Sequence, residues 1–185
     1  MIEDIIKDAS VRMQKCVDSL QGSFMKLRTG RASVGLVDHL RIDYYGSETP
    51  LSQVASVVAE DVRTLSITPW DKSMVHPIEK AIFGSDLGLT PNTAGTTIRI
   101  NIPPLTEERR RDLIKVVKAD TEQARVAIRG VRRDANQDLK DLIKEKLITA
   151  DDEKRGTQEV QKLTDHFIEL ADAAMAGKER EMMVI

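Results

Sequence analysis

The sequence predicts an α+β protein, a long three-helix bundle with an inserted small β/α/β domain. Apolar residues recur at three- and four-residue steps over residues 2–27, 106–146 and 150–174, as on one face of a helix. Between residues 31 and 104 the period changes to short β-branched or alternating runs separated by turn residues. We therefore expect residues 1–29 plus 106–185 to form the bundle and residues 31–104 to form the second domain.

The first helix is expected to run from residue 2 to near Thr29 and Gly30, about seven turns. The inserted domain follows, with strands at 39–45, 54–58, 64–68 and 96–100 and one short helix at 72–83. Glycine is permissive in its backbone angles, whereas prolines stiffen the returning chain. These two short crossings predict hinges near residues 29–31 and 102–105, formed by Thr29, Gly30, Arg31, Pro103, Pro104 and Leu105.

The second long helix is expected from Thr106, a good N-cap residue, to about Lys146. Glu107 and Glu108 suit the positive end of its dipole. A last helix is expected after Thr149, where Asp152 takes the acidic position of a capping box.

Charge is sorted around the second long helix. Its predicted apolar stripe consists of Val117, Ala124, Ile128, Val131, Ala135 and Leu142. On one side of this stripe lie Arg111, Lys118, Arg125, Arg129, Arg132 and Lys140, and on the other side lie mostly aspartates and glutamates. Interleaved charges would serve solubility better, so the sorting indicates a directional partner, and the arginine edge suits phosphate.

Composition limits the function classes. The 185 residues include 31% charged and only 3% aromatic residues, with a net charge of −2. Residues 105–135 carry nine Lys or Arg against six Asp or Glu, whereas residues 150–185 carry five against nine. A single cysteine excludes an internal disulfide, and neither a signal peptide nor a membrane-length apolar run is present. We expect a cytoplasmic protein with no membrane partner.

Five sequence blocks resemble the bacterial ribosome recycling factor family across the whole chain. The blocks are KLRTGRAS at 26–33, YYG at 44–46 with PL at 50–51, SDLGLTPN at 85–92, PLTEERR at 104–110 and RVAIRGVRRDAN at 125–136. The resemblance implies an L-shaped molecule with a hinge between its two domains. It also implies action after termination, when such a factor and elongation factor G, with GTP hydrolysis on the latter, split the ribosome and release it from mRNA.

The resemblance further implies that a bundle edge contacts the ribosomal RNA of the large subunit. Residue by residue it points to Arg28, Arg129 and Arg132, with Arg31, Arg125 and Arg133 nearby. The alternative is that these arginines are solvated and only cover core methylenes with their stems. Because few aromatic residues lie beside them, we expect recognition of the RNA backbone and shape rather than base stacking. A monomer is expected, with no DNA partner.

Catalysis is not expected. Cys16 lies on the apolar stripe of the first helix, which favours a buried structural thiol over a nucleophile. His39, His76 and His166 lie on separate elements and lack the spacing of a metal site, and no phosphate-binding loop is present. We therefore predict neither an enzyme nor a metal or cofactor. The competing hypothesis is a structural helical adaptor that associates with another coiled coil through its stripes.

Overall fold

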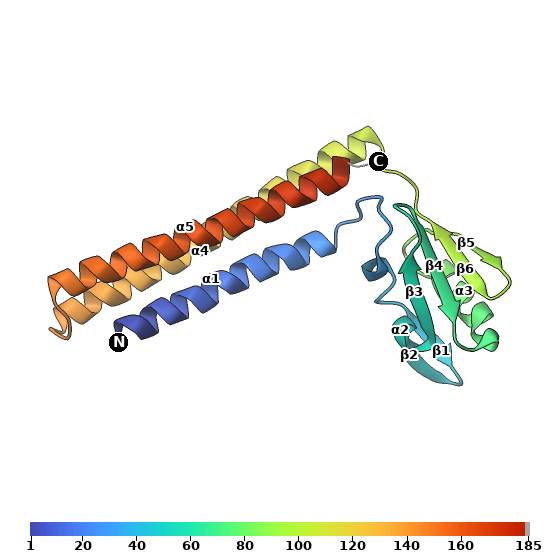
Figure 1. Cartoon of the computed structure of the whole chain (residues 1–185), viewed down its shortest axis with the longest axis horizontal. Helices are drawn as coiled ribbons and strands as arrows, with labels where there is room; N and C mark the ends of the chain where they lie inside the picture. Colours follow the sequence, from blue (N-terminus) through green and yellow to red (C-terminus); the bar gives the residue numbers. More distant parts are fainter. Residues whose placement is uncertain (184–185) are drawn as a thin grey trace. The chain divides into compact units, whose positions relative to one another are not determined.

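The computed structural model describes residues 1–183, which divide into two compact units (Figure 1). Residues Met1–Leu27 and Arg111–Met183 form the helical unit, and Arg28–Arg110 form the β unit. The α+β class predicted from the sequence is confirmed: long helices build one unit, and a sheet with a short helix builds the other.

The helical unit is built from α1 (Ile2–Met25), α4 (Glu107–Lys144) and α5 (Ala150–Met183), which run side by side. Their apolar stripes are buried against one another, with Met13, Ile128 and Phe167 among the residues at the core. The stripe predicted for α4 is buried except at Leu142, which is only half-buried, and Leu139 takes the buried position instead. Because the helix repeats every 3.6 residues, the buried line drifts toward Leu139 at this end.

One close approach fixes the packing of the helices. A Cβ placed on Gly156 of α5 would lie 3.1 Å from both methyl carbons of Leu139 and 3.4 Å from Cγ2 of Ile2. Any larger residue at position 156 would push against α4 and α1 together, so the missing side chain lets three helices meet at one level.

The helix ends differ from the prediction in one important place. The first helix ends at Met25, not near Thr29 and Gly30, because Leu27 N–H bonds the Phe24 carbonyl at 3.2 Å and tightens the last turn. Arg28 therefore lies beyond the helix. At the end of α4, Lys146 adopts a left-handed φ of 57°, and the N–H groups of Lys146 and Leu147 bond the carbonyls of Ile143 and Leu142.

The β unit contains a hairpin and a separate four-stranded sheet. The hairpin pairs β1 (Arg41–Tyr44) with β2 (Ser47–Pro50), and it leads into the short helix α2 (Leu51–Val54). The sheet has the order β3-β4-β6-β5, all antiparallel. Its strands are β3 (Ala55–Ala59), β4 (Thr64–Pro69), β5 (Pro91–Ala94) and β6 (Thr97–Asn101).

A core between the sheet and α3 (Val75–Phe83) holds this unit together. Ile78 and Ile82 of α3 and Leu65, Ile67, Ile98 and Ile100 of β4 and β6 are fully buried. The helix predicted at 72–83 is confirmed, with its first turn as the 3₁₀ segment Lys72–Met74. A second 3₁₀ turn, Val34–Leu36, precedes the hairpin.

Strands β2 and β5 were absent from the sequence prediction. Neither shows apolar alternation: β2 is Ser-Glu-Thr-Pro and β5 is Pro-Asn-Thr-Ala. β2 forms because the Tyr45–Gly46 turn, with φ of 50° and 84°, folds the chain back onto β1. β5 lies at an edge of the sheet, where a proline is tolerated because its missing N–H is not needed by another strand.

Candidate nucleic-acid interface

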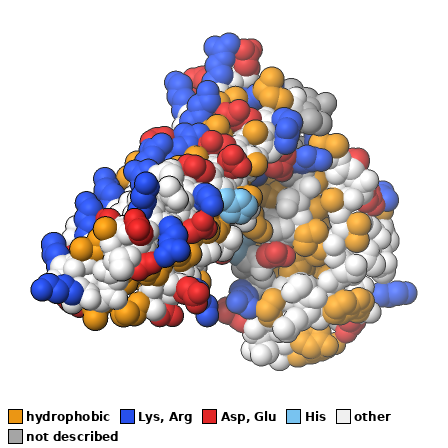
Figure 2. Space-filling view, turned by 60° about the vertical axis from the view of Figure 1, so that its left-hand side comes forward, with side chains coloured by type: hydrophobic (Ala, Val, Ile, Leu, Met, Phe, Trp, Pro, Cys, Tyr) orange, Lys and Arg blue, Asp and Glu red, His pale blue; other side chains and the backbone are white. Residues whose placement is uncertain are grey.

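The arginine edge of α4 lies on a helix whose apolar face is buried in the core of the helical unit. Ile128 and Val131 are buried, whereas Arg129 and Arg132, which follow them in the chain, are half-buried and Arg133 is exposed. Lys and Arg side chains recur along the outer edge of the helical unit, with acidic groups between them (Figure 2). How much of this positive charge is available to a ligand depends on the acceptor that each arginine side chain contacts.

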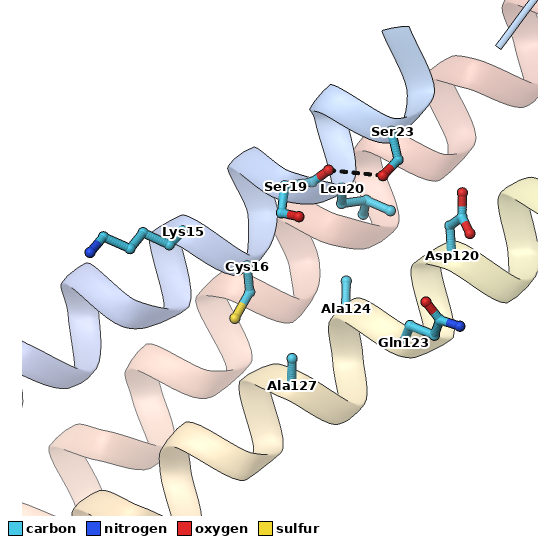
Figure 3. A pocket seen from close by; sticks show the side chains of 9 residues that line it. All are labelled: Lys15, Cys16, Ser19, Leu20, Ser23, Asp120, Gln123, Ala124 and Ala127. Carbon is cyan, nitrogen blue, oxygen red and sulfur yellow. Dashed lines mark hydrogen bonds between the residues drawn. The ribbon is translucent and has the colours of Figure 1, made fainter. Parts of the chain in front are cut away.

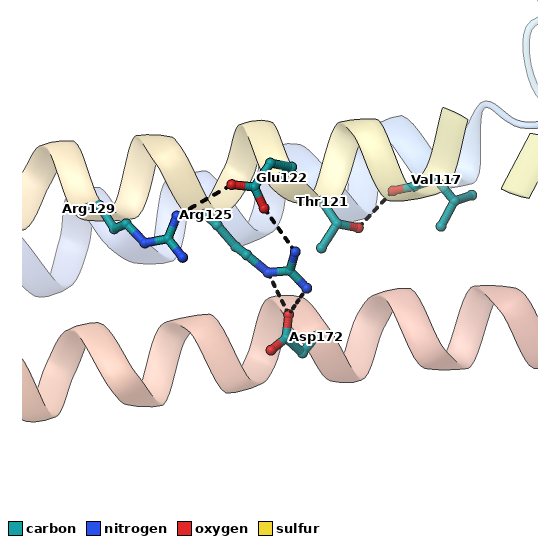
Figure 4. Close-up of polar contacts among 6 residues, drawn as sticks. All are labelled: Val117, Thr121, Glu122, Arg125, Arg129 and Asp172. Atoms are coloured by element: carbon teal, nitrogen blue, oxygen red, sulfur yellow. Dashed lines mark hydrogen bonds and ion pairs between the residues drawn. The ribbon is translucent and has the colours of Figure 1, made fainter. Parts of the chain in front are cut away.

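Arg125 is held by carboxylates on two helices. Its Nε lies 2.8 Å from Oδ1 of Asp172 on α5, and its Nη1 lies 3.0 Å from Oε2 of Glu122 on α4 (Figure 4). These hydrogen bonds, with Asp172 first and Glu122 second, raise the pKa of Arg125 above its ordinary value. Its side chain is only 22% exposed. Arg125 acts mainly as a tie between α4 and α5.

Arg129 shares the same glutamate. Its Nη1 lies 3.4 Å from Oε1 of Glu122, so one carboxylate lies between two guanidinium groups (Figure 4). Hydrogen bonding from Arg125, and then the charges of Arg129 and Arg125, lower the pKa of Glu122. The longer contact leaves Arg129, at 43% side-chain exposure, more available than Arg125.

Arg132 has a neutral partner instead. Its Nη1 donates to Oε1 of Gln161 on α5 at 3.2 Å, and Nε2 of Gln161 donates to Oδ1 of Asp165 at 2.8 Å. Among residues 1–183 no carboxylate forms an ion pair with Arg132 or Arg133. The positive charge of these two arginines is therefore not compensated by a contacting carboxylate.

Arg28 and Arg31 belong to the β unit rather than to the α4 edge. Arg28, about half exposed, donates from Nη1 to the Asp86 carbonyl at 3.4 Å, and its Nη2 lies 3.7 Å from Oδ1 of the same residue. Arg31 is exposed. The structure thus groups the predicted RNA-binding arginines into four on α4 and two at the start of the β unit.

The residues predicted as hinges meet at Gly30. Its φ is 72°, a conformation that favours glycine, and a Cβ there would lie 3.0 Å from the backbone nitrogen of Leu105 and 3.2 Å from its Cγ. The outgoing and returning connections of the chain therefore touch at this point. Close by, Ala32 N–H bonds the Val62 carbonyl and Ile102 N–H bonds the Arg63 carbonyl, both at 2.7 Å.

The other reactive side chains lie apart from this edge. A groove of about 330 Å³ between α1 and α4 is lined by Cys16 and by small or polar residues such as Ser19, Ser23 and Ala127 (Figure 3). Burial is the main reason that the pKa of the Cys16 thiol is raised, which weakens it as a nucleophile. In the described part of the chain, no three His, Cys, Asp or Glu residues gather as metal ligands would, and no helix could cross a membrane.

The sequence alone did not identify the acceptors that make the arginines differ in available charge. Glu122 precedes Arg125 by three residues, a spacing that already predicts an ion pair on a helix. Asp172 and Gln161 lie 47 and 29 residues from Arg125 and Arg132 in the sequence. Only the packing of α5 against α4 brings these side chains into contact.

The chain is similar to known proteins over its whole length. A family model described as "Ribosome recycling factor" matches residues 20–183. Ribosome-recycling factors of Legionella pneumophila (strain Paris) and Thioalkalivibrio sulfidiphilus are each 56% identical over 185 residues, with full coverage of both chains.

Solved structures agree. The solution structure of a ribosome recycling factor matches with a TM-score of 0.79 and 40% identity, covering 100% of this chain and 98% of that one. A second match is the Thermus thermophilus factor, in models with Escherichia coli elongation factor G bound to a post-termination complex. It has a TM-score of 0.67 and 46% identity, with 98% of both chains covered. The chain belongs to the ribosome recycling factor family.

Proposed function

We propose that this chain binds the ribosomal RNA of the large subunit through the arginine edge of α4. With elongation factor G and GTP, it then disassembles the post-termination ribosome and frees it from mRNA. The observation that carries the RNA-binding part is the charge left on Arg132 and Arg133, beside the partly available Arg129. Support for the partner comes from the 46% identical relative, which is described together with elongation factor G on a post-termination complex.

The six predicted arginines contribute unequally in this proposal. Arg129, Arg132 and Arg133 meet phosphate groups directly, since a planar guanidinium can bridge two phosphate oxygens. Arg125 orders the edge by tying α4 to α5 through Asp172. Arg28 and Arg31 extend the contact from the β unit. Thr29–Arg31 and Pro103–Leu105 act as the hinges between the two units.

Nucleotide hydrolysis belongs to the partner in this proposal, since the sequence holds no glycine-rich phosphate-binding loop that ends in Lys-Ser or Lys-Thr. The chain works in the cytoplasm as a monomer, and not as an enzyme in its own right. The coiled-coil adaptor hypothesis gains no support, because the apolar stripes of α1, α4 and α5 are already buried within the helical unit.

Salt-dependent binding to isolated large ribosomal subunits tests the proposed contact. We expect Arg132→Ala to weaken binding roughly 10- to 100-fold, the usual loss for a charge-assisted hydrogen bond. The slope of log K against log salt should also fall by about one unit, since one phosphate contact is lost. Arg129→Ala should act in the same direction but less strongly, because Glu122 already neutralises part of its charge.

Lys15→Ala is the matched control. It removes one positive charge from α1 beside the groove that also contains Gln123, away from the arginine edge. Binding and salt slope should stay those of the wild type. If Arg132→Ala behaves like this control at physiological salt, the proposed RNA contact is wrong.

A further inference from the structure

The arginines of α4 differ in the chemical nature of their acceptors. Arg125 and Arg129 donate to carboxylates, which cancel positive charge, whereas Arg132 donates to the amide oxygen of Gln161. A neutral carbonyl can orient a guanidinium while leaving its charge intact. It also uses one of five N–H donors and leaves the others for a second acceptor.

The orientation of Gln161 is itself determined. Its Nε2 donates to Oδ1 of Asp165, one turn further along α5, at 2.8 Å. A carboxylate accepts hydrogen bonds but cannot donate one, so the amide nitrogen must face Asp165 and the amide oxygen must face Arg132. Asp165 thus sets which atom of the amide meets the guanidinium.

Arg132 is therefore steered from a different helix. A free arginine side chain samples many rotamers, and fixing them on binding costs free energy. The Asp165–Gln161–Arg132 series of hydrogen bonds, which crosses from α5 to α4, restricts the guanidinium before any ligand arrives. A glutamate at position 161 would restrict it equally well but would cancel its charge.

We infer that Gln161 is a positioning residue of the RNA interface, whose amide holds Arg132 without neutralising it. This inference rests on the proposed function, in which Arg132 meets an RNA phosphate. It assigns to α5 a part in RNA binding that its own acidic composition does not indicate.

Two substitutions separate orientation from charge. Gln161→Ala removes the orienting oxygen and keeps the charge of Arg132. We expect binding to large ribosomal subunits to weaken roughly two- to tenfold, the usual effect of one unrestrained side chain, with an unchanged salt slope. Gln161→Glu should weaken binding further and lower the slope by up to about one unit, because a carboxylate then competes with phosphate.

Gln123→Glu is the charge-matched control, since Gln123 lies nine residues before Arg132, on the opposite side of α4, and lines the groove beside α1. It adds the same negative charge away from Arg132 and should bind as the wild type does. Thermal melting of each variant checks that the bundle remains folded.

The Arg132→Ala variant, measured in parallel, separates two kinds of failure. If Arg132→Ala binds like the wild type, the proposed function fails. If Arg132→Ala weakens binding while both Gln161 variants match the wild type, only the positioning role of Gln161 is overturned. A salt slope that falls as much with Gln161→Ala as with Gln161→Glu would also overturn it, because that role separates orientation from charge.

Discussion

Glu122 limits the positive charge of the arginine edge at two arginines. Its two carboxylate oxygens contact Arg125 at 3.0 Å and Arg129 at 3.4 Å. Arg125 has a second acceptor in Asp172, whereas Glu122 is the acceptor recorded for Arg129. A phosphate group that approaches Arg129 must therefore compete with this carboxylate, so Glu122 opposes RNA binding in our proposal.

Neutralising Glu122 should consequently strengthen binding. We expect Glu122→Gln to raise the affinity for large ribosomal subunits about two- to fivefold, the scale of one exposed ion pair, and to steepen the salt slope. Glu159→Gln makes the same charge change at a carboxylate paired with Lys162 on α5 and should leave both values unchanged. Equal or weaker binding by Glu122→Gln would show that Arg129 is not a phosphate contact.

At the scale of the element, the start of α5 is defined by a reciprocal cap. Thr149 Oγ1 accepts the Asp152 N–H at 3.2 Å, and Asp152 Oδ2 accepts the Thr149 N–H at 3.1 Å. The capping box predicted from the sequence is thereby confirmed. The Thr149 hydroxyl and N–H, together with Arg155, lower the pKa of Asp152.

This cap makes the stability of α5 depend on pH. An aspartate whose pKa is lower in the folded than in the unfolded chain stabilises the fold above its ordinary pKa of about 3.9. That contribution is lost as the pH falls through the lowered folded-state value. We expect Asp152→Asn to melt at a lower temperature than the wild type at pH 7, with a difference that shrinks steadily below about pH 4.

Asp151→Asn provides the comparison, because this exposed neighbour shares the first turn but not the bonds to Thr149. Its melting temperature at pH 7 should stay closer to that of the wild type. A difference for Asp152→Asn that persists unchanged at pH 2.5, on the order of one pH unit below the ordinary value, would exclude the capping carboxylate as its source.

The sequence predicts elements well where one face is strongly apolar. The stripe of α4 and the helix at 72–83 were found because their burial repeats with the helical period. Strands β2 and β5 were not predicted because their own side chains show no apolar alternation. A hairpin turn holds β2 in place, and pairing at the edge of the sheet holds β5. For the candidate site, the wheel separated Ile128 from Arg129 correctly, but charge compensation by Asp172 and Gln161 depends on packing between helices.

At the scale of the whole molecule, the chain crosses twice between two compact units, between Leu27 and Arg28 and between Arg110 and Arg111. The two β-unit segments near these crossings touch where Gly30 meets Leu105, and a Cβ on Gly30 would lie 3.0 Å from the Leu105 backbone nitrogen. Two adjacent covalent links restrict relative motion to few directions without preventing it. We therefore retain the mobile β unit as a prediction.

Solution X-ray scattering tests this mobility. We expect the scattering curve to require a range of angles between the two units, because only short connections restrain them. Gly30→Ala should narrow or shift that range, since its Cβ would press on the Leu105 backbone. A curve that one rigid angle fits, for the wild type and the variant alike, would argue against the hinge.

The division of the helical unit between the two ends of the sequence has a consequence for synthesis of the chain. Residues Arg28–Arg110 are contiguous, so the β unit can fold as soon as it leaves the exit tunnel. α1 is made first, yet its partners α4 and α5 are made last. At a synthesis rate of about 5–20 residues per second, the apolar stripe of α1 stays without its packing partners for several seconds or more. A nascent chain is therefore most exposed to chaperones and to aggregation through α1, until the second half of the bundle emerges.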